Sequence, residues 1–465
     1  MSVIGCVSLP QTVTSDRQGT PPGSSTLPAI SSFVAQPYPA SEPTLTLAGT
    51  ADFDASDLSE TQRLWYDRLW RAIDASLDDH VESAKGDNVY SAGRTIYLFN
   101  HALLTGLRAT GDLAFLDAVD EVAQAIRHEL RDAWCGGVAG VVDVNVRYGT
   151  VRSPDGFLNL RLRRGDDIHY CRDTGDLNET LTHGHLALVM YAYHVNRDNP
   201  SPSGIDYGER ADFWLDYLRN HFEAKWRQRS NTAWPDMDFI DLKFCHTYHQ
   251  MLMYFTYVGL SLRSDGDPMA DAYLRQTMRL TEGMFRVPYR AGRQPGGFID
   301  VDTPLGTAVV YSFGAPGSVD TPAAHLEACP VTYARYMLAS VLNLRLDGTS
   351  GWDDDIMQRI ATGLAYFVID TEPLHERDSP FAAGVSGERA VDMLPPTEYR
   401  DRNSIDRFSV TPFAAWSAWD PSDTIARTSL EVYAAVESDS DDPRSVHLPA
   451  GLLLAATLEA SSSLR

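Results

Sequence analysis

Two short segments of this chain concentrate side chains that can bind, donate or accept a proton. The first runs from His169 to His185, and the second runs from Asp236 to Gln250. An apolar stretch follows each segment, so we expect their polar groups at the entrance of a buried helix. Amide, Lys, Arg and protonated His groups neutralise carboxylates, whereas neutral His and Tyr exchange protons. The candidate catalytic residues are Asn178, His183, His185, Lys243, His246 and Tyr248, with His249 as a substrate contact.

This mixture of groups fits β-elimination on a uronic-acid polymer. Such an enzyme must neutralise a carboxylate so that the proton beside it becomes acidic. It must then remove that proton and protonate the departing glycosidic oxygen. We therefore expect a polysaccharide lyase whose partner is an anionic polysaccharide.

The order of the residues resembles that of the alginate lyases and related glucuronan lyases with α/α toroid folds. An Asn and a His stand at one inner-helix entrance, and a cation and a Tyr stand at the next, about sixty residues on. The resemblance implies that Asn178 and Lys243 neutralise the carboxylate. It makes His183 or His185 the base or a second neutralising group, and Tyr248 the acid and the alternative base. Those lyases typically carry Arg where Lys243 stands.

Helix geometry divides the two segments further. Residues two apart on a regular helix point about 200° away from each other. His183 and His185 therefore cannot share a face, and the same holds for His246 and Tyr248. If Tyr248 faces elsewhere, tyrosines and arginines of other loops would complete the site. The candidates for this and for substrate binding are Tyr90, Tyr289, Tyr311, Arg94, Arg172, Arg290 and Arg293.

The elements that would position these residues alternate between two kinds of helix. Amphipathic segments with one polar face predict outer helices, and segments that are apolar nearly all round predict inner helices. The outer helices are expected near 58–80, 113–133, 207–227, 267–286, 352–369 and 424–437. The inner partners are expected near 91–108, 180–195, 246–262, 330–346, 408–419 and 447–459. The pattern predicts an all-α (α/α)6 or (α/α)7 toroid with long loops, and short β-hairpins within 138–148 and 297–313.

Residues 1–50 are predicted to form a flexible tether, and residues 51–465 a single catalytic domain. The first segment is rich in Ser, Thr, Pro and Gly through Ser41, a composition typical of linkers. Val3 to Cys6 is similar to the end of a bacterial lipoprotein signal, although the basic and apolar segments that normally precede it are missing. We expect a secreted, periplasmic or lipid-anchored bacterial protein, or alternatively one with an ordinary disordered N-terminus.

Composition limits the partners. With 39 basic and 63 acidic residues the formal net charge is -24, which argues against nucleic acid. No run is long enough to cross a bilayer. The five cysteines show no metal-binding or disulfide pattern, and no carboxylate spacing accompanies the histidines as a zinc site would need. We expect a monomer without cofactor or metal.

Two other function classes stay open. A glycoside hydrolase on the same architecture would need two carboxylates flanking the scissile bond. The candidates for that role are Asp87, Asp176, Glu179, Asp241 and Glu327. The third class is a non-catalytic lipoprotein that binds glycans.

Overall fold

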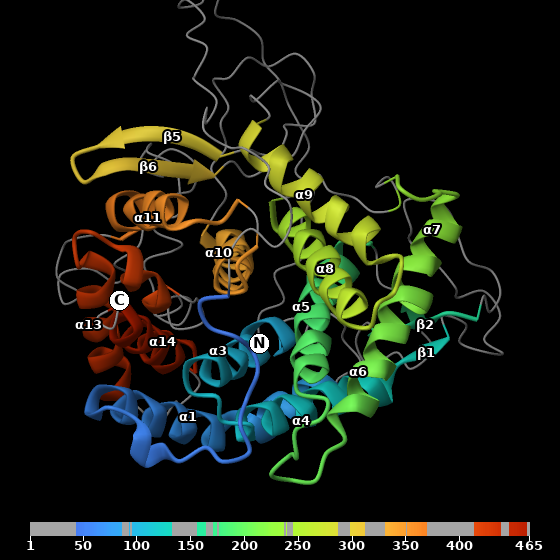
Figure 1. Ribbon diagram of the computed structural model, residues 1–465, viewed down its shortest axis with the longest axis horizontal. Coiled ribbons are helices and arrows are strands. Elements are labelled where there is room, and N and C mark those ends of the chain that lie inside the picture. Colours follow the sequence, from blue (N-terminus) through green and yellow to red (C-terminus); the bar gives the residue numbers. More distant parts are fainter. Residues whose placement is uncertain are drawn as a thin grey trace, which may run out of the picture.

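The structure is a computed structural model, and its described residues are mostly helical, which confirms the all-α prediction (Figure 1). They comprise 43–85, 93, 95–132, 156–163, 171–173, 176–236, 239, 245–286, 298–311, 331–349, 351–369, 413–438 and 446–462. Among these residues, no helix combines the length and apolar character that crossing a membrane requires.

The outer helices lie close to their predicted positions. They are α1 (Glu60–Lys85), α4 (Ala114–Glu129), α6 (Tyr207–Asp216), α9 (Ala270–Arg286), α11 (Asp354–Gly363) and α13 (Thr424–Ser438). The π-helix η3 (Tyr217–Glu223) and α7 (Ala224–Ser230) continue α6, and the π-helix η5 (Leu364–Val368) continues α11. Asp206 caps α6 by accepting from the Glu209 amide, and Asp353 caps α11 by accepting from the Ile356 amide. These caps satisfy amides that have no partner within the helix.

The inner helices also match the apolar segments of the sequence. They are α3 (His101–Thr110), α5 (Asp176–Val195), α8 (Cys245–Ser264), α10 (Val331–Leu346) and α14 (His447–Ser462). The π-helix η2 (Ile96–Asn100) leads into α3, and the 3-10 helix η8 (Ala414–Trp419) stands before α13. Figure 1 shows the outer helices around the inner ones. Contacts run from α3 to α5, α8 and α10 in chain order, and α14 packs against both α3 and α1.

Small antiparallel pairs supplement the helices. The strands β5 (Phe298–Thr303) and β6 (Gly306–Tyr311) form a hairpin that packs on α11, as predicted within 297–313. The other pairs, which the sequence analysis did not predict, are β1 (Arg131–Asp132) with β2 (Leu158–Asn159), and β3 (Arg161–Arg163) with β4 (Cys171–Asp173). The hairpin expected within 138–148 lies outside the described residues.

The C-terminal ends of the inner helices meet at one end of the molecule, which we call the closed end. Arg108 of α3 forms an ion pair with Asp347, which directly follows α10. Tyr257 of α8 donates to the same carboxylate at 2.8 Å. Thr457 of α14 donates to the carbonyl of Ala109 in α3. These contacts show that the inner helices run in the same direction, so their N-terminal halves also share one end.

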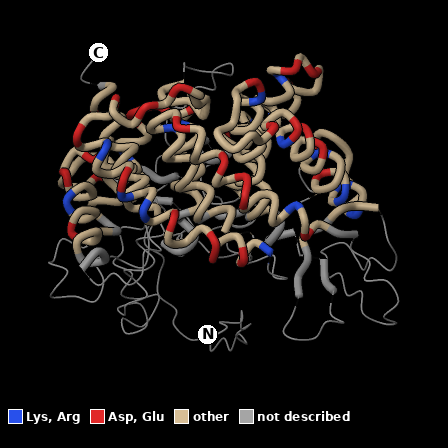
Figure 2. The backbone as a smooth tube through the Cα atoms, turned by 90° about the horizontal axis from the view of Figure 1, so that it is seen from below, with Lys and Arg blue, Asp and Glu red and all other residues tan. Residues whose placement is uncertain are grey.

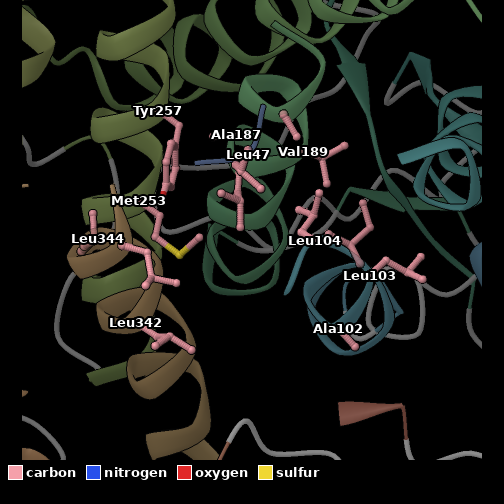
Figure 3. Close-up of a cluster of buried hydrophobic side chains, with 14 of the residues drawn as sticks. Leu47, Ala102, Leu103, Leu104, Ala187, Val189, Met253, Tyr257, Leu342 and Leu344 are labelled. Carbon is pink, nitrogen blue, oxygen red and sulfur yellow. The ribbon is translucent and has the colours of Figure 1, made fainter. Parts of the chain in front are cut away.

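Residues 43–50, the N-terminal strap, cross the closed end. The Leu45 carbonyl accepts from Arg108, and the Thr44 amide donates to the carbonyl of Leu346. Leu47 is 1% exposed, and Figure 3 shows it among apolar side chains of the inner helices. The predicted tether boundary at residue 50 is therefore wrong for the strap, because burial of Leu47 and the backbone hydrogen bonds hold it against the helices.

Candidate functional site

Polar side chains gather between the inner helices, away from the closed end. All of them are at most 4% exposed. We call this group the axial cluster. Its members are Tyr97 and Asn100 from η2, His101 from α3, His185 from α5, Gln250 from α8, Tyr336 and Ser340 from α10, and His447 from α14.

Ring contacts join the members of the axial cluster across helix boundaries. The ring centroid of Tyr97 lies 4.0 Å from that of Tyr336 and 4.7 Å from that of His185. The His101 centroid lies 6.1 Å from His185 and 5.8 Å from His447. Segments separated by hundreds of residues therefore supply one compact set of imidazole and phenol groups.

Asn100 and His101 are the least satisfied members of the cluster, because both side-chain polar atoms of each lack a hydrogen-bond partner among the described residues. The Asn100 side chain is fully buried, and neither amide atom has a hydrogen-bond partner among the residues that the structure describes. The same holds for Nε2 of His185. A buried amide without partners costs free energy, about 1–3 kcal/mol for each group left unpaired. Such groups are rare in native proteins and are found where a ligand or water completes them.

The local backbone explains how Asn100 reaches this position. Ile96–Asn100 is a π-helical turn that passes into the α-helix at His101. Single π-helical turns are uncommon and occur frequently at functional sites, because the wider turn changes the direction of its side chains. Tyr97, Asn100 and His101 come from this turn and from the residue after it.

Burial keeps the imidazoles of His101 and His185 neutral. It lowers the pKa of His185 to about 4, although the hydrogen bond with Gln250 opposes this shift. Burial also lowers the pKa of His101 well below its ordinary value, and the neighbouring His447, His185 and Arg108 lower it further. Each of these neighbours is cationic when protonated. Perturbed pKa values of this kind mark candidate functional sites.

His185 is held by a chain of polar contacts from α8 and α10. Its Nδ1 lies 2.7 Å from Oε1 of Gln250, whose Nε2 donates to Oγ of Ser340 at 3.4 Å. The Ser340 hydroxyl donates to the carbonyl of Tyr336 at 2.7 Å. Gly184 permits the close approach of α5 and α8, since a Cβ there would lie 2.4 Å from Oε1 of Gln250.

His183 does not belong to the axial cluster. Its ring stacks on Phe222 with 4.0 Å between centroids, and its Nε2 lies 2.9 Å from the Tyr217 hydroxyl. Both partners belong to the outer π-helix η3. As the helix geometry predicted, His183 and His185 face different ways, so the expectation of a catalytic His183 is not supported.

Tyr248 does not take the predicted position either. Its hydroxyl donates to the Leu280 carbonyl of α9 at 2.7 Å, and its ring is 5% exposed. Burial raises the pKa of this hydroxyl well above its ordinary value. The tyrosine packs α8 against an outer helix, so the structure uses the Tyr248 hydroxyl in a contact between helices and does not bring it into the axial cluster. His249 is fully buried on the same helix.

The structure gives less about the remaining candidates. Only the backbone is described for Asn178 in α5, Arg172 in β4, His246 in α8 and Tyr311 in β6, and for the hydrolase candidates Asp176 and Glu179. The candidates outside the described residues are Tyr90, Arg94, Lys243, Tyr289, Arg290 and Arg293, together with Asp87, Asp241 and Glu327.

Sequence reasoning found His185 and the segment ending at Gln250 but missed most of the axial cluster. Asn100 and His101 stand side by side within the apolar stretch 96–107. Burying polar side chains there costs free energy unless they find hydrogen-bond partners, so such a pair is a candidate for function. His447 opens the apolar stretch 447–459 in the same way. A search for polar residues inside apolar helices would have named these three.

Within the described ranges, no group of three His, Cys, Asp or Glu side chains is arranged to hold a metal ion. No protein-family model matches the sequence, and no curated protein or solved structure matches it either. The axial cluster itself therefore carries the functional argument.

Proposed function

We propose that the helices close into an α/α toroid, and that the axial cluster cleaves a polyuronate, alginate or glucuronan, by β-elimination. One observation carries the proposal: the unpaired amide of Asn100 lies buried among neutral imidazole and phenol groups. This is the set of groups that the reaction needs, and it comes from several helices that meet only in the folded chain.

The substrate carboxylate would supply the missing hydrogen-bond partner of the Asn100 amide. Nδ2 of Asn100 would donate to it, with His101 beside it as a second donor. Withdrawing charge from the carboxylate makes the proton on the neighbouring carbon acidic.

His185 would then act as the base. Its Nε2 takes the proton, the electron pair of that C–H bond forms a carbon–carbon double bond, and the glycosidic C–O bond breaks. The departing oxygen takes a proton from Tyr97, whose ring contacts this imidazole, or from Tyr336, whose ring contacts Tyr97. A neutral histidine is required for this role, and a bound anion raises the pKa of nearby imidazoles. The base therefore strengthens when an acidic substrate binds.

The described groups that shift the pKa of these imidazoles differ from those that a hydrolase uses. A hydrolase uses paired carboxylates. In the described parts of the chain, the groups that shift the pKa of His101 are His447, His185, Arg108 and the Ala339 backbone, and the group that acts on His185 besides burial is Gln250. None of them is a carboxylate.

The negative charge of the molecule limits how it could bind an anionic polysaccharide. Figure 2 shows acidic residues distributed along the described helices, and the chain as a whole carries a formal net charge of -24. A polyanion is therefore repelled by the overall field. Recognition would rest on neutral hydrogen-bond donors in a buried site, where interactions are stronger than in water.

The decisive assay incubates the protein with alginate, glucuronan and pectate while following ultraviolet absorbance and reducing ends together. We expect both to rise on alginate or glucuronan, because the new double bond is conjugated with the carboxylate. Reducing ends without new absorbance would indicate a hydrolase, and binding without turnover would indicate a glycan-binding protein. Either result would rule out the lyase.

Two matched variants test the assignment of residues. His185→Gln should abolish turnover. His183→Gln should keep it, because His183 faces Tyr217 and Phe222 of the outer helix η3. Tyr248→Phe should also keep activity, since its hydroxyl serves α9. Loss of activity in Tyr248→Phe with an unchanged melting temperature would restore the original assignment of that tyrosine.

A further inference from the structure

The contacts around His185 raise the question of which ring nitrogen carries its proton. A neutral imidazole has one N–H donor and one lone-pair acceptor. Only the nitrogen with the lone pair can serve as a base. The choice between the two tautomers is set by what the other nitrogen bonds to.

The proton positions follow from a count along the polar chain. Ser340 has a single hydroxyl proton, and at 2.7 Å that proton points to the Tyr336 carbonyl one helical turn earlier. The Ser340 oxygen can therefore only accept from Gln250. The amide nitrogen of Gln250 must face Ser340, which turns its carbonyl oxygen toward His185.

An acceptor 2.7 Å from Nδ1 requires that Nδ1 be the N–H donor. The opposite tautomer would bring two lone pairs face to face in a fully buried place, which leaves both groups unsatisfied. Gly184 holds this geometry tightly, because the backbone carbonyl of Gln250 would also lie 2.4 Å from a Cβ at that position. A side chain there would push α8 away from α5.

We infer that Gln250 and Ser340 are positioning residues that fix His185 in the tautomer with the proton on Nδ1, which leaves the lone pair of Nε2 for chemistry. Nε2 is the buried nitrogen that has no partner in the described part of the chain. The inference depends on the proposed function for what this lone pair does, but the tautomer is measurable without any substrate.

The titratable groups that face this imidazole come from several helices. Tyr97 of η2 and His101 of α3 contact its ring, Tyr336 of α10 lies against Tyr97, and His447 of α14 lies behind His101. Gln250, from α8, contributes no charge of its own. A carboxylate in place of this amide would add the nearest negative charge and favour the protonated imidazole.

The experiment uses the full chain labelled with 15N at histidine and two-bond 1H–15N correlation spectra. The His185 signal is assigned by its loss in His185→Gln. We expect Nε2 in the unprotonated range and Nδ1 in the protonated range. Gln250→Glu should keep this tautomer and raise the pKa of His185 by about one unit or more. The acidic limb of the kcat/KM profile should move in the same direction.

Removing the Ser340 hydroxyl should have a smaller effect on His185, and the chain offers a matched control. Ser340→Ala frees the Gln250 amide to turn, so the two nitrogen shifts of His185 should move toward each other. Ser261→Ala is the matched control, because Ser261 is equally buried on an inner helix and donates to the Tyr257 carbonyl one turn earlier. It should leave His185 unchanged.

The outcomes separate this inference from the proposed function. A proton on Nε2 in the unaltered protein would overturn the inference, and so would an unchanged His185 pKa in Gln250→Glu. If the expected tautomer is found and no polyuronate is cleaved, the lyase proposal is wrong and the positioning role stands. If Gln250→Glu does not fold, the Ser340→Ala spectra decide, and unchanged nitrogen shifts there would overturn the inference.

Discussion

Two buried asparagines show how the ends of the inner helices differ. Asn196, just after α5 at the closed end, donates to the carbonyls of Leu47 and Ala192, and it accepts from the amides of Gly49 and Asn199. Asn100, at the opposite end, makes none of these bonds within the described residues. Both side chains are fully buried. The same residue type at the same burial is saturated in one place and unsatisfied in the other.

The contrast extends to the charges. At the closed end Arg108 bonds to both oxygens of Asp347 and to the side chain of Asn343. In the axial cluster, histidines face one another, and no described carboxylate contributes to the pKa shifts of His101 and His185. Polar groups that hold helices together find partners in the protein, whereas groups kept unpaired fit a partner that arrives from solution. We therefore assign stability to the first end and binding to the second.

The largest effect on stability is expected at the closed end. Asp347→Asn would leave the Arg108 charge buried without its counterion, and removing one partner of a buried pair costs about 3–5 kcal/mol. The side chains of Arg108 and Asp347 are 1% and 5% exposed, respectively. Denaturant unfolding followed by circular dichroism measures the change in free energy of unfolding.

The control for this variant is Asp271→Asn. Asp271 pairs with Arg263 on the surface, where both side chains are well exposed. An exposed pair contributes at most about 1 kcal/mol. Equal losses in the two variants would show that the closed end does not have the stabilising role assigned to it.

A smaller loss of stability, arising in the axial cluster, is expected when the pH is lowered. The pKa of His185 is lowered to about 4 in the folded chain, whereas the unfolded chain has the ordinary value of about 6.5. Between these values the unfolded chain binds more protons, so the stability due to the neutral imidazole is present above about pH 6.5 and is lost as the pH falls toward 4. The shift corresponds to about 3 kcal/mol.

The measurement compares the free energy of unfolding of the unaltered protein and of His185→Gln from pH 7 to pH 4. The unaltered protein should lose more stability over this range, by up to about 3 kcal/mol. Parallel curves for the two proteins would show that His185 is not held neutral by burial. The proposed difference in electrostatics between the closed end and the axial cluster would then be wrong.

Much of the fold could be predicted because hydrophobic periodicity reports directly on burial. The amphipathic stretch that became α4 and the wholly apolar stretch that became α14 were placed within a few residues of their observed bounds. The strap was missed, because its leucines, Leu45 and Leu47, stand in a short segment rich in Thr. Its burial depends on the distant ends of α3, α5 and α10, which no local pattern reveals.

The site was harder to predict for the same reason. Local clustering of polar residues led to His183 and Tyr248, whose polar atoms are satisfied by Tyr217 and by the Leu280 carbonyl. Neither partner is close in sequence. Asn100 was passed over because it stands within an apolar helix, yet its unpaired amide is what distinguishes it. Satisfaction of a buried polar group is a property of the tertiary structure, so the sequence predicts candidates but not which of them stay unpaired.

The smallest expected change in stability gives the sharpest test of the comparison. Leu has the same number and branching of side-chain heavy atoms as Asn, and it needs no hydrogen bonds. Asn196→Leu should cost about 2–4 kcal/mol, because it leaves the Gly49 amide and the Leu47 carbonyl unpaired. Asn100→Leu removes a group that has no partner to lose in the described part of the chain. Its free energy of unfolding should stay unchanged or rise by about 1 kcal/mol.

Activity should respond in the reverse order. If the unpaired amide of Asn100 binds the substrate carboxylate, Asn100→Leu should reduce kcat/KM by about a hundredfold or more, as expected when a charge-stabilising donor is removed. Asn196→Leu should keep its kcat/KM wherever it remains folded. A variant that is as stable as the unaltered protein and inactive would separate binding from stability at a single position. Loss of stability without loss of activity in Asn100→Leu would instead mean that this amide is structural, and the carboxylate must then be bound elsewhere.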